Sequence, residues 1–397
     1  MIRTTALCVA LLTGGVVSAQ GARNRSLEDA VALLAKDIKE GLGGAKQEVI
    51  LGTFGAHPKS NVAVHANPVP ELIRLLTAAL AKLDVKVAGA RANHTVTGAY
   101  REIDETSTGM LGVKLEFTLT DKEADKQREY SQFVTNQKDV AKLFGVSHEV
   151  PPGADAKAIF ASLQQEAKKF NPKSPEKPTP ALDQFAVLPA AGSKFAIEVY
   201  TAPPKKDPKE AHAVEDYVAR KPTDEDGLAF VKIDRGHVYG IQFVNNADFD
   251  AAVSLTIDGL SMYVACDKED PGTKAKLRDD QGRPLHNFVI VPKKSKFFLR
   301  GWFINMRDTD EFLVTEYAKS FAAQFPQSAG RVGVITACFH AAVLENQAFP
   351  AGEPNDPTPL TQSDDGTGGG ARVHSPYVLE KRKIGLLRAT VSVRYSK

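Results

Sequence analysis

Residues 111–119 read Leu-Gly-Val-Lys-Leu-Glu-Phe-Thr-Leu, and this stretch decides the fold of the first half of the chain. Every second residue from Leu111 to Leu119 is apolar, which is the two-residue period of a half-buried β-strand. The charged stretch 121–126 supplies a turn, and residues 129–134 return as the next strand. Residues 96–100, Val-Thr-Gly-Ala-Tyr, alternate in the same way before it. The sequence therefore predicts a run of antiparallel strands.

Helical patterns surround these strands. Ser26 followed by Asp29 resembles a capping box, in which the Ser oxygen accepts a free backbone N–H at the start of a helix. The prolines at 68 and 70 open a second helix, because proline suits the first helical turn. We expect residues 20–170 to form an α/β domain with a mixed sheet and trailing helices. The expected helices cover 26–41, 68–83, 137–143 and 156–170, and a short buried strand covers 47–54.

A change in composition divides the chain after residue 170. Residues 171–180 contain four prolines, which favours a Pro-rich linker over 171–185. Beyond it, short segments of period two are separated by turn sequences such as Asn245-Asn246 and Asp258-Gly259. This pattern predicts an antiparallel β-sandwich over 186–345.

The end of the chain has two further segments. Residues 346–375 are rich in Pro, Asp and Gly, so we expect a flexible loop. Residues 376–397 close with a strict apolar alternation and are expected to return to the β-domain as a strand. The predicted fold class is thus α+β, an N-terminal α/β domain with a mixed sheet followed by a C-terminal antiparallel β-sandwich.

The first 19 residues have the pattern of a secretion signal. Arg3 precedes an apolar stretch over 6–17, and Val17-Ser18-Ala19 supplies the small residues that signal peptidase requires. About a dozen apolar residues are too few to span a bilayer. We therefore expect residues 1–19 to be a cleaved signal peptide and the protein to be exported, to the periplasm or to the cell surface.

The overall composition is that of a neutral globular protein. In 397 residues, 50 Lys and Arg stand against 48 Asp and Glu, a formal net charge of +2, and 43% of residues are hydrophobic. Such a balance produces no global field that would draw the protein onto nucleic acid. We expect no nucleic-acid partner and no transmembrane segment in the mature chain.

Part of the first half resembles a known domain. Residues 50–54, the helix over 69–83, and residues 96–100 followed by 113–115 resemble the small α/β domain of bacterial envelope proteins. That group includes the curli-secretion component, flagellar outer-membrane lipoproteins and the lipoprotein activators of penicillin-binding proteins. The resemblance covers about 100 residues, a typical domain length, and implies a fold without a catalytic signature. The second half, with residues 239–245, is similar to uncharacterised β-domains of bacterial secreted proteins.

Two departures limit what this resemblance implies. The chain has no cysteine at the expected mature N-terminus for a lipid anchor, and no segment similar to the pore-forming hairpins of the curli component. We therefore infer neither a pore nor a synthase-activating role for this chain from the resemblance.

The chain contains no motif that predicts catalysis or cofactor binding. It has no Gly-x-Ser-x-Gly, no phosphate-binding Gly-Lys-Ser/Thr loop and no His-Glu-x-x-His. His57 and His65 flank a loop between a strand and a helix, where ligands often bind, but two imidazoles are weak support for zinc. We expect no catalytic, cofactor-binding or metal-binding residues. Cys266 and Cys338 either form a disulfide in an oxidising compartment or remain free core thiols.

Three functional hypotheses remain. The favoured one is a non-enzymatic exported cell-envelope protein that binds an envelope protein or a cell-wall component. The first alternative is an envelope hydrolase near Cys338 and His340, which share one side of a strand. The second is a Ca²⁺-dependent adhesive or carbohydrate-binding module, for which the candidate carboxylates are Asp248 with Asp250 and Asp308 with Asp310.

Overall fold

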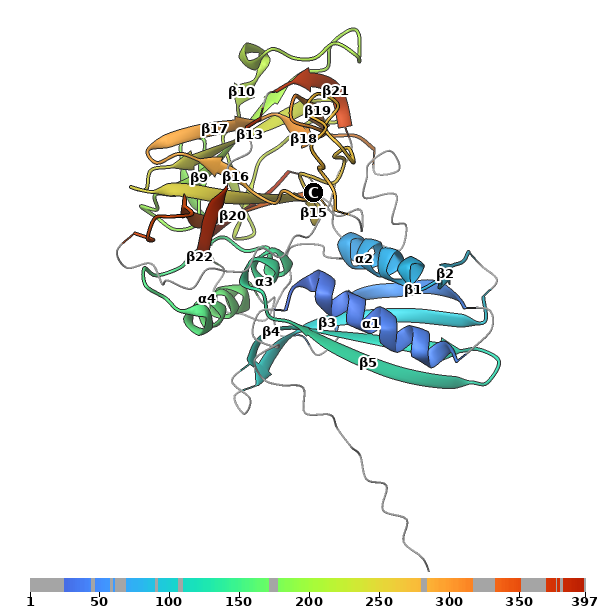
Figure 1. Ribbon diagram of the computed structural model, residues 1–397. Helices are drawn as coiled ribbons and strands as arrows, with labels where there is room; N and C mark the ends of the chain where they lie inside the picture. Colours follow the sequence, from blue (N-terminus) through green and yellow to red (C-terminus); the bar gives the residue numbers. More distant parts are fainter. Residues whose placement is uncertain are drawn as a thin grey trace, which may run out of the picture.

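The computed structural model describes most of the chain beyond the N-terminus. The described residues are 25–43, 47–57, 60, 69–89, 92–105, 110–170, 178–279, 284–316, 333–350, 369–375, 377–378 and 381–395. The expected signal peptide lies outside these ranges. The protein has a mixed α/β architecture dominated by sheet, with the N-terminal elements below the β-rich part in Figure 1.

A five-stranded sheet forms the N-terminal part. Its strand order is β2-β1-β3-β4-β5, in which β1 pairs in parallel with β2 and β3, and the remaining neighbours are antiparallel. The prediction of a mixed sheet is confirmed. The strands are β1 (Glu48–Ala56), β2 (Lys86–Val87), β3 (His94–Glu105), β4 (Met110–Asp121) and β5 (Lys126–Val134).

Helices α1 (Leu27–Leu42) and α2 (Val69–Lys82) pack side by side on one face of this sheet. Ser26 caps α1, since its hydroxyl accepts the backbone N–H of Asp29 at 3.1 Å. The apolar alternation of β4 supplies the other side of the contact, with Leu115 and Phe117 fully buried against the helices. Burial of this face accounts for the packing of helix on sheet.

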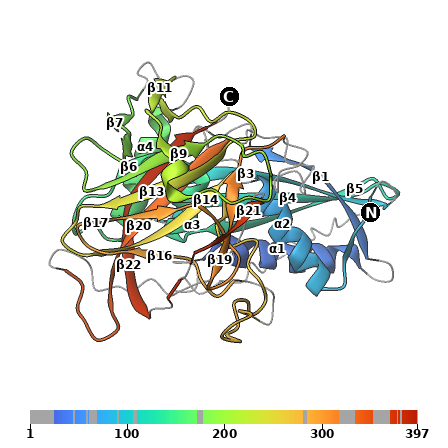
Figure 2. The same ribbon diagram turned by 90° about the horizontal axis from the view of Figure 1, so that it is seen from above.

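Two further helices connect this unit to the β-rich part. They are α3 (Gln137–Phe144) and α4 (Ala156–Lys169), separated by the short strand β6 (His148–Glu149). Strand β6 pairs with β22 (Arg382–Arg394), and the Thr390 hydroxyl donates to the Val146 carbonyl. Figure 2 shows α3 against β20 (Val334–Leu344) and β22. Cys338 and Leu387 belong to the same hydrophobic cluster as the N-terminal sheet and its helices.

Two larger sheets form the second half of the chain. In the described residues, one has nine strands along the order β18-β19-β13-β9-β8-β7, and the other has eight along β11-β12-β22-β20-β14-β15. Both sheets contribute to one hydrophobic cluster, in which Phe243 of one and Phe339 of the other meet edge to face.

The bounds of the strands in the nine-stranded sheet are as follows: β7 (Ala181–Asp183), β8 (Ala186–Leu188), β9 (Phe195–Ala202), β10 (Val218–Ala219), β13 (Val238–Asn245), β17 (Ser295–Leu299), β18 (Gly301–Phe303), β19 (Asp308–Leu313) and β21 (Gly369–His374). In addition to β6, β20 and β22, the eight-stranded sheet contains β11 (Thr223–Glu225), β12 (Leu228–Phe230), β14 (Asp250–Ile257), β15 (Leu260–Ser261) and β16 (Val289–Val291). A 3-10 turn, η1 (Val214–Asp216), precedes β10.

The structure differs from the sequence predictions in three places. Residues 369–374 form β21, so the segment expected to be a loop up to 375 ends in a strand that pairs with β19. Strand β7 begins inside the expected linker. Strand β12 pairs with β22 in parallel, at Phe230 and Arg394, so the eight-stranded sheet is not purely antiparallel. Strands β21 and β12 depend on partners far away in the sequence, which local patterns do not identify, whereas β7 pairs with the adjacent β8.

A long connection, residues 203–217, crosses the nine-stranded sheet on the side away from the shared cluster; we call it the strap. Tyr217 at its end packs edge to face on Phe298, which in turn packs edge to face on Tyr200. The strap is further held by Glu311 of β19, whose carboxylate accepts the His212 backbone N–H at 3.0 Å and the Tyr217 hydroxyl at 2.9 Å.

Candidate functional site

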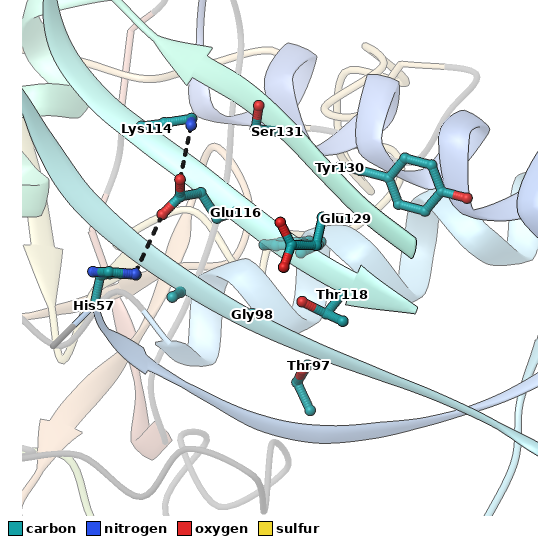
Figure 3. A pocket seen from close by; sticks show the side chains of 11 residues that line it. His57, Thr97, Gly98, Lys114, Glu116, Thr118, Glu129, Tyr130 and Ser131 are labelled. Atoms are coloured by element: carbon teal, nitrogen blue, oxygen red, sulfur yellow. Dashed lines mark ion pairs between the residues drawn. The ribbon is translucent and has the colours of Figure 1, made fainter. Parts of the chain in front are cut away.

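The face of the N-terminal sheet opposite α1 and α2 carries a polar hollow of about 420 Å³. Because side chains alternate along a strand, the residues between the buried positions of β4 point to this face. Thr118 of β4 lies between Thr97 of β3 and Glu129 of β5 in the sheet, whereas Tyr130 turns toward α1 (Figure 3). The residues that line the hollow are His57, Thr97, Gly98, Ala99, Lys114, Glu116, Phe117, Thr118, Glu129, Tyr130 and Ser131.

Glu116 lies between Lys114 and His57 in Figure 3, and Arg101 also forms an ion pair with its carboxylate. Its carboxylate is 2.7 Å from Lys114 Nζ and 3.1 Å from Arg101 Nε. His57 Nε2 lies 3.8 Å from the same carboxylate. Burial acts to raise the pKa of Glu116, but hydrogen bonds from Arg101 and Lys114 outweigh it and hold the pKa at about 2. Glu116 is therefore a fixed negative charge and a poor proton acceptor near neutral pH.

Strand pairing positions this cluster. Arg101 of β3 is directly opposite Lys114 of β4, and Ala99 is opposite Glu116, so the small Ala99 side chain leaves space beside the carboxylate. His57 follows the last residue of β1, and its backbone N–H donates to the Tyr100 carbonyl at 2.9 Å. The cluster thus depends on three neighbouring strands that share one register.

Glu129 of β5 supplies the other charge of the hollow. It lies directly opposite Thr118, which in turn lies opposite Thr97 of β3. Glu129 is exposed, and no ion pair joins it to a residue within the described ranges. The hollow therefore has a cationic cluster around one carboxylate and, farther along, a second carboxylate beside hydroxyl groups.

The floor of the hollow is rigid because large rings pack beneath it. Phe54 and Phe117 meet edge to face with ring centroids 5.4 Å apart. The Phe54 ring lies on Gly98, where a Cβ atom would approach it to 2.4 Å. Glycine at this position lets the ring lie directly against the backbone of β3. The polar groups above are thus held on a packed sheet, which suits recognition.

Sequence reasoning identified one residue of this site. His57 was singled out as the start of a strand–helix loop, and it lies in the hollow; His65 lies outside the described residues. Arg101, Lys114 and Glu129 were not singled out. For Lys114, the available signal was its place at a polar position of the alternation in residues 111–119. Only the strand register brings its side chain together with those of Arg101 and Glu129.

The geometry does not support the hydrolase alternative. Cys338 and His340 are both buried, at 0% and 3% exposure. Burial raises the pKa of the Cys338 thiol to about 11 and lowers the pKa of His340 to about 3. His340 Nδ1 bonds to the Gly385 carbonyl at 3.1 Å. A nucleophilic thiolate needs a depressed pKa and access to substrate, and this thiol has neither.

The structure contains no disulfide between Cys266 and Cys338. Both side chains are buried, and the two sulfurs are not bonded to each other. Cys338 belongs to the cluster beneath α3, whereas Cys266 belongs to the cluster shared by the two larger sheets. The alternative of free core thiols is the one that the structure shows, because the two side chains pack into different cores.

The candidate calcium carboxylates have protein cations as partners. Asp248 lies 2.8 Å from Lys294 Nζ, and Asp250 lies 3.0 Å from Arg382 Nη1. Asp310 pairs with Arg372 across the β19–β21 contact, and Asp308 lies 3.6 Å from His374 Nδ1. Among the described residues, no group of three or more His, Cys, Asp or Glu side chains could hold a metal ion. The carboxylates of Asp248, Asp250 and Asp310 are thus already compensated by lysine or arginine.

No protein-family model, no curated protein and no solved structure matches the chain. None of the helices in the described part of the chain combines the length and the apolar character needed to cross a membrane.

Proposed function

We propose that the protein is a non-enzymatic, exported cell-envelope protein that binds its partner through the hollow on the N-terminal sheet. The observation that supports this most directly is the hollow of about 420 Å³, which lies on a packed sheet and is lined by fixed charges and hydroxyl groups. Its volume falls at the lower end of the range of ligand sites.

Binding fits this site better than catalysis. Glu116 is held as a carboxylate by Arg101 and Lys114, so it stores no proton and takes none near neutral pH. The thiol and imidazole at Cys338 and His340 are buried with pKa values shifted away from reactivity. Charges that stay constant and are anchored to a rigid sheet instead provide complementarity to a polar partner.

Two further parts of the proposal concern the fold. We propose that the N-terminal unit is of the envelope-protein type that residues 50–54 and 96–100 resemble. We also propose that the two larger sheets form a β-sandwich, which their shared hydrophobic cluster supports. In this arrangement the sandwich carries the binding unit through α3, α4 and β6.

Site-specific photocrosslinking in the exporting cell tests the proposed function. A photoreactive amino acid at Thr118, inside the hollow, should give a discrete adduct with an envelope component. The same amino acid at Lys232, whose side chain is 78% exposed on the β-rich part, is the matched control and should give none. Glu129→Lys changes the charge of the hollow without breaking an ion pair between described residues, and should reduce the Thr118 adduct.

Two results would contradict the proposal. The first is the absence of any adduct from Thr118 in cells that export the folded protein. The second is an adduct whose yield is unchanged by Glu129→Lys, since such a partner would not be recognised through the hollow.

A further inference from the structure

Within the described residues, β5 is the longest strand that pairs along one side only. Its nine residues pair with β4, and no backbone hydrogen bond joins its other side to another described segment. In Figure 1, β5 lies along the lower margin of the N-terminal sheet, on the side away from the β-rich part. The outward N–H and C=O groups of such a strand are a template for one more strand.

The other strands at the ends of the three strand orders are short. Strands β2, β7, β11, β15 and β18 have two or three residues each. Short edge strands protect a protein against pairing with another chain. Strand β5 lacks this protection and therefore offers a full-length edge.

A two-fold axis permits only some registers between two β5 strands. Two copies related by an axis perpendicular to the sheet run antiparallel, and each face of one sheet continues as the same face of the other. Because residues directly opposite each other must share a face, one residue at the axis lies opposite its own copy. Each register is thus defined by the residue at its centre.

The charges of β5 exclude several of these registers. If the centre is Arg128 or Glu129, each charge lies opposite its own copy, and if the centre is one residue before Arg128, Lys126 lies opposite Arg128. Like charges directly opposite each other destabilise a strand pair. If the centre is Tyr130, the strands overlap along all nine residues, and Glu129 lies opposite the hydroxyl side chain of Ser131. Registers centred beyond Tyr130 shorten the overlap.

We propose that two copies of the protein form a dimer through β5, in the antiparallel register centred on Tyr130. Ser131 of each copy then donates a hydrogen bond to Glu129 of the partner subunit, and the two Tyr130 rings meet at the axis. The self-complementary charge pattern is the reason for assigning this edge to a second copy. The two N-terminal sheets become one continuous sheet, and both hollows lie on the same face because the axis is perpendicular to it.

Sedimentation equilibrium of the purified protein tests the dimer. Ser131→Glu puts a carboxylate opposite Glu129 twice in each dimer and should weaken dimerisation about fivefold, whereas Ser131→Lys puts an ammonium group there and should strengthen it about fivefold. Asn246→Glu and Asn246→Lys, at an exposed position just after β13, are the matched controls and should dimerise as the native protein does.

Disulfide formation tests the register. A mixture of Glu129→Cys and Ser131→Cys proteins should form a linked dimer on oxidation, because directly opposite Cβ atoms lie about 5 Å apart. Either variant alone should give at most about a tenth of this yield, since its two new cysteines are offset along the strands and lie roughly 8 Å apart. The native protein, in which Cys266 and Cys338 are buried, is the control and should form no linked dimer.

Three results would overturn the inference. The first is a native protein that stays monomeric at every concentration measured. The second is equal dimer stability in Ser131→Glu and Ser131→Lys, and the third is an equal disulfide yield from the mixture and from the single variants. The last two would mean that the dimer forms through another surface or register. None of them bears on the proposed function, which the Thr118 adduct tests separately.

Discussion

His340 shows how the position of a residue within a sheet determines its protonation and its reactivity. Its spacing from Cys338 allows a dyad, but β20 lies in the middle of a sheet with α3 packed over it. Burial lowers the pKa of His340 to about 3, and its ring packs edge to face on Phe288. The side chain is therefore a neutral core residue whose Nδ1–H donates a hydrogen bond to the Gly385 carbonyl.

This burial makes stability depend on pH in a defined direction. Above pH 6.5 His340 is neutral in both states and contributes no pH dependence. Below pH 6.5, His340 binds a proton in the unfolded chain, but in the folded chain it stays neutral until about pH 3. The free energy of unfolding therefore decreases as the pH falls from 6.5 to about 3. At pH 5 the loss is about 2 kcal/mol.

The variant His340→Gln tests this effect by urea unfolding at pH 7.5 and at pH 5. The decrease in unfolding free energy between the two pH values should be smaller in the variant by about 2 kcal/mol. His374→Gln, whose native side chain is 71% exposed, should leave the decrease unchanged. An identical decrease in native protein and His340→Gln would show that His340 is protonated in the folded state.

At the level of elements, local patterns and distant pairing differ in how well they can be predicted. Helix α1 and strand β4 follow from signals within one segment, namely the Ser26 cap and the alternation in residues 111–119. The pairing of β6 with β22 joins residues more than 200 positions apart, and nothing in residues 148–149 indicates it. The hollow was not predicted for a different reason: the alternation shows which residues share a face, but not the register of β3, β4 and β5 that places their side chains opposite one another.

The strap is an element whose order depends on one buried carboxylate. Glu311 is 1% exposed and lies 3.0 Å from His212 Nδ1, in addition to its two contacts described above. His212 Nε2 lies 2.8 Å from the Pro203 carbonyl, so the imidazole connects the start of the strap to β19. Removal of the carboxylate would leave the imidazole, a backbone N–H and a hydroxyl group without their acceptor.

We predict that Glu311→Ala releases the strap. The loss of a buried partner costs about 3–5 kcal/mol, which is enough to increase tryptic cleavage after the exposed Lys206 and Lys209 by at least about tenfold. Glu215→Ala, an exposed carboxylate within the strap, is the control and should be cleaved at the native rate. Native cleavage rates in Glu311→Ala would mean that the aromatic contacts of Tyr217 hold the strap without Glu311.

At the level of the whole molecule, α3, α4 and β6 join the N-terminal sheet to the β-rich part. Helices α3 and α4 belong to the hydrophobic cluster of the N-terminal sheet, and the same cluster includes Cys338 and Leu387 of the β-rich part. Strand β6 adds backbone pairing to this contact, and Ser147 accepts the backbone N–H of Ser392 at 2.9 Å. The hollow is therefore carried on a unit that is packed against the eight-stranded sheet.

Thiol labelling in the native envelope measures most directly whether the hollow is covered. The two cysteines in the described residues are buried, so a cysteine introduced as Ser131→Cys provides a reactive thiol in the hollow. A bound partner should slow its reaction with a maleimide in intact cells by about fivefold relative to purified protein, as expected for occupancy of about four fifths. Lys232→Cys on the β-rich part should react equally fast in both settings. Equal rates for Ser131→Cys in cells and in purified protein would contradict the central claim that the hollow is the binding surface.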